Sequence, residues 1–171
     1  MTDVRPASDG VQLCTSCGLC CAGALHDTAA LAPDERTLAS AAGLALVKGD
    51  FALPCPRLVE RRCAIYPHRP RVCSRYRCRL LSDMEGGRLD LPSALQHVRT
   101  ALALTNGLAR LLPEPMTLPE LRKLWLRAEQ LPPPVQLQLA ATTDYLDRHF
   151  RPLSEAAMAT SHRVGACPAA A

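Results

Sequence analysis

The sequence predicts a mostly α protein with one short β-hairpin, in which a small cysteine-cluster module is followed by a C-terminal helical extension. Three observations support this prediction. Eight of the nine cysteines fall within 65 residues, between Cys14 and Cys78. Helix-capping residues and leucine stripes at helical spacing fill the second half of the chain. Runs of residues that alternate as a strand requires are few.

Length and composition exclude several classes of protein. The 171 residues fit one domain, or a compact module with an extension. Apolar residues make up 48%, enough for a core, but no uncharged apolar run is long enough to cross a membrane. Aromatic residues, at 4%, are too few to stack the bases of single-stranded nucleic acid. Residues 1–6 lack the apolar stretch of a secretory signal, so we expect a cytoplasmic protein with reduced thiols.

The chain divides into two structured segments with loose ends. We expect the module at residues 12–82, the helical extension at residues 90–152, and no ordered structure at residues 1–11 and 154–171. Within the module, a hairpin would pair Leu58-Val59 with Ala64-Ile65-Tyr66.

Helix signals mark one helix in the module. Pro33 suits the first helical position, and Asp34 and Glu35 suit the positive end of the helix dipole. One face of this helix would carry the apolar residues Leu31, Leu38, Ala42 and Ala45.

Three further helices follow in the extension. Ser93 with Gln96, and Thr117 with Glu120, have the spacing of capping boxes. The buried face of the helix after Thr117 would consist of Leu121, Leu124, Trp125 and Ala128. The last predicted helix runs from Val135 to Phe150, after a triple-proline break.

The cysteine spacing is typical of a metal site. The first group, Cys14, Cys17, Cys20 and Cys21, reads C-x2-C-x2-C-C, and a two-residue gap lets one turn aim two sulfurs at one ion. Three cysteines at this spacing also follow the local pattern of ferredoxins, in which a remote Cys-Pro supplies the fourth ligand, and Cys55-Pro56 is the candidate. Buried free thiols are the alternative, but this spacing suits no single buried face.

We therefore predict that the module is centred on metal. The candidate metal ligands are Cys14, Cys17, Cys20, Cys21, Cys55, Cys63, Cys73 and Cys78. The cofactor is an iron–sulfur cluster (4Fe-4S) or zinc, because both accept four thiolates. The triad with Cys-Pro favours the cluster, whereas a structural role in a small module favours zinc. Eight thiolates would fill two four-ligand sites, or one site with four to spare, and His26 or His68 could replace a thiolate on zinc.

Eight arginines and a single acid, Glu60, lie between Arg57 and Arg79. A phosphate or nucleic-acid groove is one interpretation. Compensation of thiolate charge is the interpretation we favour, since guanidinium groups donate hydrogen bonds to metal-bound sulfur. We accordingly expect no nucleic-acid partner.

The order of these motifs along the chain resembles that of the YkgJ-type cysteine-cluster family, whose members are described as zinc- or iron-chelating domains. The family pattern is C-x2-C-x2-C-C, an acidic helix start, Cys-Pro, and C-x-I-Y-x2-R-P-x2-C-R. This chain has the same order, with Asp34-Glu35, Cys55-Pro56 and the run from Cys63 to Cys73 through Tyr66 and Arg69-Pro70. Ser74 stands where the family has arginine, and Cys78 lies outside the common core. The resemblance covers residues 12–80 and implies metal binding there.

The sequence leaves the biological role open among three classes. These are a structural or metal-handling module, a cluster-dependent redox or protein-modifying enzyme or its accessory, and a zinc-stabilised adaptor for protein or nucleic acid. A similar motif occurs in iron–sulfur flagellin lysine N-methylases, but this chain has no G-x-G-type nucleotide loop. We expect a monomer or homodimer, leave room for an unidentified protein partner, and expect no membrane partner.

Overall fold

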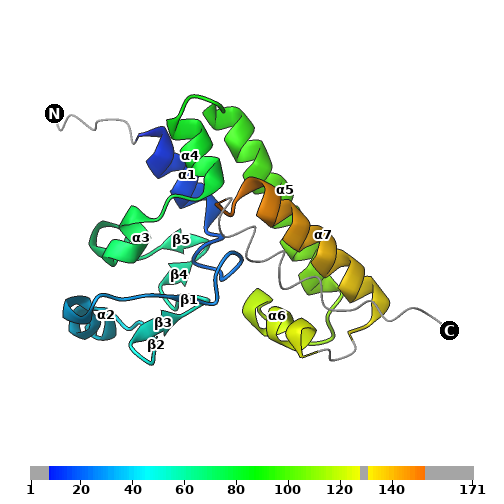
Figure 1. Cartoon of the computed structure of the whole chain (residues 1–171), viewed down its shortest axis with the longest axis horizontal. Helices are drawn as coiled ribbons and strands as arrows, with labels where there is room; N and C mark the ends of the chain where they lie inside the picture. Colours follow the sequence, from blue (N-terminus) through cyan, green and yellow to red (C-terminus); the bar gives the residue numbers. More distant parts are fainter. Residues whose placement is uncertain (1–7, 128–130, 153–171) are drawn as a thin grey trace.

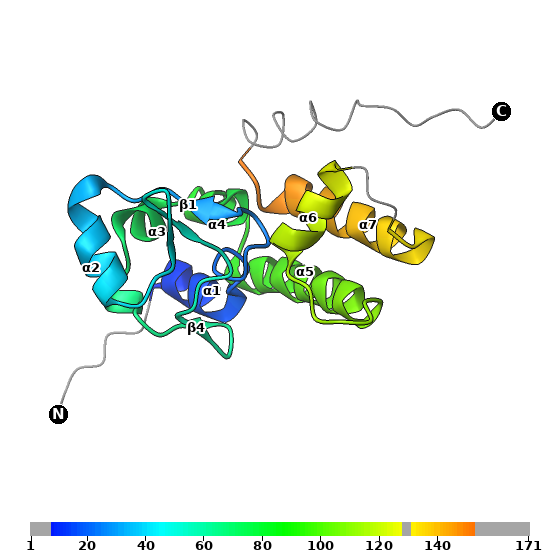
Figure 2. The same cartoon turned by 90° about the horizontal axis from the view of Figure 1, so that it is seen from below.

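The computed structural model describes residues 8–127 and 131–152 of the chain. Its longer helices are α1 (Asp9–Cys17), α5 (Leu91–Arg110), α6 (Leu118–Leu126) and α7 (Pro133–His149). Its shorter ones are α2 (Arg36–Ala41), α3 (Arg71–Arg75) and α4 (Arg79–Glu85), with the 3-10 turns η1 (Pro33–Glu35) and η2 (Tyr66–His68). The predicted mostly α class is confirmed. The helical segments α5, α6 and α7 form one side of the molecule, and the short elements form the other (Figures 1 and 2).

The strands form two small antiparallel sheets. The strands β4 (Leu58–Val59) and β5 (Arg62–Cys63) make the predicted hairpin. Its second strand lies at 62–63 rather than at 64–66, because Glu60 and Arg61 make a two-residue turn, both with positive φ. A second sheet, in the order β1 (Thr28–Ala29), β3 (Asp50–Ala52), β2 (Leu46–Val47), was not predicted. Strands of two or three residues are too short to show a period.

The helix starts agree with the sequence at three of four places. Pro33 opens η1, which continues into α2. α7 begins at Pro133, inside the triple-proline run and two residues before the predicted start at Val135. The capping box of Thr117 and Glu120 is confirmed. The capping box of Ser93 and Gln96 is wrong, because Asp90 caps α5 by accepting a hydrogen bond from the Ser93 amide at 2.9 Å.

Three residues of the predicted apolar faces are exposed. Leu38 is 73% exposed, and Ala39 instead turns inward from α2. Ala45 is exposed because α2 ends at Ala41, before the predicted face is complete. Trp125 is 45% exposed, whereas Leu121 is buried as predicted. Ala128 lies outside the described residues.

The predicted module and the helical extension share one core. Leu13 of α1, Leu19, and Leu80 and Leu81 of α4 pack with residues of the two longest helices. The helix residues in this core are Ala94, Val98, Ala101, Leu146 and Phe150. Residues 9–11, placed in the segment expected to lack order, belong to α1; residues 1–7 and 153–171 lie outside the described residues.

Two arginines of the extension hold the loop that follows the first cysteine group. Arg151, just beyond α7, is 7% exposed, forms an ion pair with Asp147, and donates to the Leu25 and Ala24 carbonyls at 3.2 and 3.3 Å. Arg122 of α6 donates to the Gly23 and Ala24 carbonyls at 2.7 and 3.1 Å. These donors satisfy loop carbonyls that no strand or helix pairs.

Arg151→Ala should therefore destabilise the whole protein. The substitution removes the cation beside the buried carboxylate of Asp147 and the donors to two carbonyls, and we expect a loss of about 3–5 kcal/mol in the free energy of unfolding. Arg148→Ala is the matched control, since Arg148 pairs with Asp144 at the surface and its loss should cost about 0.5 kcal/mol or less. Denaturant unfolding of both variants gives the comparison, and equal losses would contradict this role of Arg151.

Candidate metal centre

All eight cysteines of the motif line one cavity of about 320 Å³. They come from α1, the turn after it, the segment before β4, β5, α3 and the start of α4. All eight are free thiols. Residues up to 64 positions apart in the sequence are thus brought to the same space.

The first cysteines are placed by α1 and by the turn that ends it. Cys14 and Cys17 are three residues apart in α1 and so share one face. Gly18 ends the helix at φ 68°, in the left-handed region, and a tight turn then carries Cys20 back toward the cavity. Cys78 faces them as the N-cap of α4, and its sulfur accepts a hydrogen bond from the Leu81 amide at 3.4 Å.

The other four cysteines are held together by backbone pairing. The Cys55 amide donates to the Cys21 carbonyl at 2.7 Å, and the Leu58 amide donates to the Cys55 carbonyl at 3.0 Å. Leu58 in turn pairs with Cys63 across the β4–β5 hairpin. Cys73 on α3 packs with Cys21 and Cys55 against the core around Phe51. Cys55 and Cys63 are therefore linked through Leu58 at the open end of the hairpin.

Burial keeps these thiols protonated in the absence of metal. Desolvation raises the pKa of Cys17 to about 12 and that of Cys20 well above its usual range. Desolvation, reinforced by neighbouring cysteines, also raises the pKa of Cys21 to about 12 and that of Cys73 to about 11. A cation is needed at this place to make thiolates favourable, and metal binding would release protons.

Two cationic side chains line the same cavity. Arg69 lies over the ring of Tyr66, with its guanidinium carbon 3.9 Å from the ring centroid. The charge of Arg69 lowers the pKa of Cys14, Cys21 and Cys73, against the larger effect of burial. Arg61, at the hairpin turn, also lines the cavity. These contacts agree with charge compensation as the role of part of the arginine run.

Four other arginines of that run have local partners. Arg71 bonds to Asp34 and Glu35, Arg77 pairs with Glu85, and Arg79 Nε lies 3.8 Å from an Asp83 carboxylate oxygen. The carbonyl of Ala42 accepts from Arg57. Acidic residues thus pair with three of the eight arginines that the linear sequence presents as one run.

The donor set fits a metal, but the sulfurs surround a space rather than a point. In residues 8–127 and 131–152, no three Cys, His, Asp or Glu side chains converge closely enough to hold one ion. Four sulfurs 2.3 Å from a zinc ion lie about 3.8 Å from one another, so zinc would require the thiols to rotate inward. In a 4Fe–4S cluster each cysteine binds a different iron, so the ligands stay farther apart.

The two histidines considered as alternative zinc ligands differ in their location. His26 lines the cavity and contacts the Tyr76 ring edge-on, with ring centroids 4.8 Å apart. His68, in η2, is not among the residues that line the cavity. The ninth cysteine, Cys167, lies outside the described residues.

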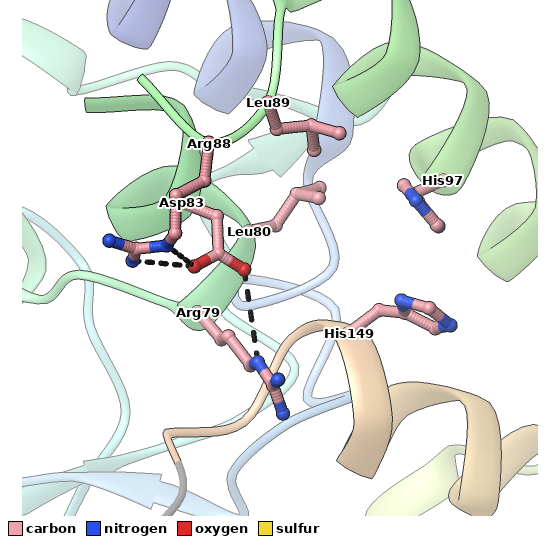
Figure 3. Close-up of a pocket in the computed structure, with 7 residues that line it drawn as sticks. All are labelled: Arg79, Leu80, Asp83, Arg88, Leu89, His97 and His149. Atoms are coloured by element: carbon pink, nitrogen blue, oxygen red, sulfur yellow. Dashed lines mark hydrogen bonds and ion pairs between the residues drawn. The ribbon is translucent and has the colours of Figure 1, made fainter. Parts of the chain in front are cut away.

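A second, smaller cavity of about 220 Å³ lies between α4, α5 and α7 (Figure 3). Asp83 accepts from Arg88 at 2.8 and 2.6 Å and approaches Arg79, while His97 and His149 enter from the two long helices. The histidine rings are stacked with centroids 4.3 Å apart, and His97 Nδ1 lies 2.8 Å from the Tyr145 hydroxyl. Asp83 pairs with both Arg79 and Arg88, and no cysteine lines this cavity.

Comparison with known families confirms the resemblance drawn from the motif. Residues 13–90 match the family model CxxCxxCC, described as "Putative zinc- or iron-chelating domain". The match covers just under half of the chain. Searches of curated proteins and of solved structures gave no significant match. None of the described helices is long and apolar enough to cross a membrane.

Sequence reasoning missed the residues that hold the cavity from outside the motif. Arg122 reaches across 99 positions and Arg151 across 126 or more to the loop after Cys21. The spacing of Asp147 and Arg151 is visible as an i, i+4 pair, but its burial is not. The long-range partners left no signal in the sequence.

Gly18 offers a test of how the first cysteine turn is positioned. A Cβ on Gly18 would lie 2.6 Å from the Arg61 carbonyl oxygen, and its φ of 68° is itself strained for alanine. Gly87 has a similar φ of 70° but open space around it. Gly87→Ala should therefore cost about 1 kcal/mol from backbone strain alone.

We expect Gly18→Ala to cost about 2 kcal/mol more than Gly87→Ala, because the turn must move away from the hairpin. Thermal or denaturant unfolding under reducing conditions measures both variants. If the two variants lose the same stability, the turn after α1 and the β4–β5 loop do not depend on close approach.

Proposed function

We propose that this chain is a metal-binding protein whose cysteine-lined cavity holds an iron–sulfur centre, with zinc as the alternative. The observation that carries the proposal is the meeting of all eight motif cysteines at one cavity of about 320 Å³. Soft thiolate donors select zinc, copper(I) and iron–sulfur clusters over oxygen-preferring ions. The family description, zinc- or iron-chelating, supports the same class of ligand.

The arrangement of the thiols favours the cluster over zinc. The thiols surround a space, and no three of the described side chains suit a single ion. Cluster ligands bind separate irons and need not crowd around one atom. Arg61 and Arg69 would oppose the negative charge that four thiolates leave on either centre.

The role that these features support best is that of a non-enzymatic metal module, structural or metal-handling. The metal, when bound, would link the chain segments that carry the thiolates and, in the cluster form, would supply one-electron chemistry. Arg61 and Arg69 would compensate charge. We propose a cytoplasmic, reducing setting, in which free thiols persist until metal binds. We also propose no nucleic-acid partner, since Arg71, Arg77 and Arg79 already have acidic partners.

Purification without oxygen, followed by elemental and sulfide analysis, tests this proposal. We expect brown protein with broad visible absorption and acid-labile sulfide in proportion to iron. Colourless protein with stoichiometric zinc would establish the alternative metal and reject the cluster. Protein that carries neither metal, and takes up neither after reconstitution, would overturn the proposed function.

Substitution of a cavity cysteine should remove metal, whereas substitution of the ninth cysteine should not. Cys20→Ala deletes a buried sulfur at the cavity, and we expect at least a twofold loss of metal per chain. Cys167→Ala is the matched control, since Cys167 lies outside the family match. Metal retention by Cys20→Ala at the wild-type level would exclude Cys20 as a ligand.

A further inference from the structure

The number of sulfurs at the cavity exceeds what one centre uses. Structural zinc takes four ligands, and a 4Fe–4S cluster takes four cysteines. Eight cysteines line the cavity. Either four of them are spare, or there are two centres with four ligands each.

Packing separates the cysteines into two sets. Cys17, Cys20 and Cys78 pack against the core that includes Leu13, Leu80 and Leu81. Cys21, Cys55 and Cys73 pack against a different core, which includes Phe51. None of these six cysteines belongs to both cores.

The backbone assigns the remaining two cysteines. Cys14 lies one turn before Cys17 on α1, so the two share one face of that helix. α1 contacts both α4, which Cys78 caps, and β5, which carries Cys63. Cys63 pairs with Leu58, whose amide bonds to Cys55, and the Cys55 amide bonds to Cys21. Four cysteines thus gather between α1 and α4, and four gather around the hairpin.

The packing also separates Cys55 from the local triad. Cys78 packs against the same core as Cys17 and Cys20, whereas Cys55 belongs to the core around Phe51. This differs from the ferredoxin-based expectation for Cys55.

The division into two sets also explains the adjacent pair Cys20-Cys21, which the ferredoxin pattern does not contain. Both residues lie in the turn after α1, yet Cys20 packs into one core and Cys21 into the other. One peptide bond would therefore link a ligand of one centre to a ligand of the other. Arg69 lines the cavity that both sets share.

We propose that the chain holds two tetrathiolate metal centres, one bound by Cys14, Cys17, Cys20 and Cys78 and the other by Cys21, Cys55, Cys63 and Cys73. This inference rests on the proposed function and deepens it. The proposal makes Cys78, which lies outside the common core of the family pattern, the fourth ligand of the first centre. The metal at both centres is the thiophilic metal of the proposed function, an iron–sulfur cluster or zinc.

Metal content of paired variants tests the division. Wild-type protein and the variants Cys78→Ala, Cys63→Ala and Cys78→Ala/Cys63→Ala are purified without oxygen, and metal per chain is measured on the soluble, monodisperse fraction. We expect each single variant to keep about half of the wild-type metal and the double variant to keep almost none. Cys167→Ala is the control and should keep all of it.

The outcomes distinguish failure of the division from failure of the function. Metal-free wild-type protein would reject the proposed function itself. Wild-type protein with metal, of which either single variant loses all or none, would overturn the two-centre proposal and leave metal binding intact.

A measurement on unmodified protein covers the case in which a variant does not fold. Native mass spectrometry of the wild-type holoprotein should show the mass of two centres, with a species bearing one centre during chelator treatment. A fully loaded species with a single centre would overturn the proposal.

Discussion

The free-energy cost of burying charged thiolates is the constraint on which the rest of this structure depends. Eight cysteine sulfurs meet at one cavity, and burial raises the pKa of most of them well above the ordinary value. Without a cation the sulfurs must stay protonated, and with one they can ionise and bind. Two arginines that line the cavity can compensate the negative charge of the thiolates. Arg69 is stacked on Tyr66, and Arg61 lies at the hairpin turn.

The helical side of the molecule supports this cavity although it supplies no cysteine among the described residues. Its two long helices pack on α1 and α4 through one shared core. Cys14 and Cys17 lie on α1, and Cys78 caps α4. Arg122 and Arg151 hold the carbonyls directly after the Cys20-Cys21 pair. The extension therefore holds the loop at residues 23–25, which follows the Cys20-Cys21 pair, in place by hydrogen bonds. The module and the extension thus depend on each other for stability.

How much of this the sequence predicts depends on whether a signal is local. The cysteine spacing, the Thr117–Glu120 capping box and the hairpin at Leu58 involve neighbours in the chain, and each is recovered from residues alone. The β1–β3–β2 sheet was not predicted, because its strands are only two or three residues long. Which cysteines share a set depends on how α1 meets α4, a long-range contact without a sequence period.

X-ray absorption at the metal edge of the protein purified without oxygen tests the central claim most directly. The account predicts a first shell of sulfur alone, at about 2.3 Å, with no light-atom ligand. A second, metal–metal distance would mark a cluster, and its absence would mark zinc. A first shell dominated by nitrogen or oxygen would contradict the account, because it would place the metal away from the cavity that the eight cysteines line.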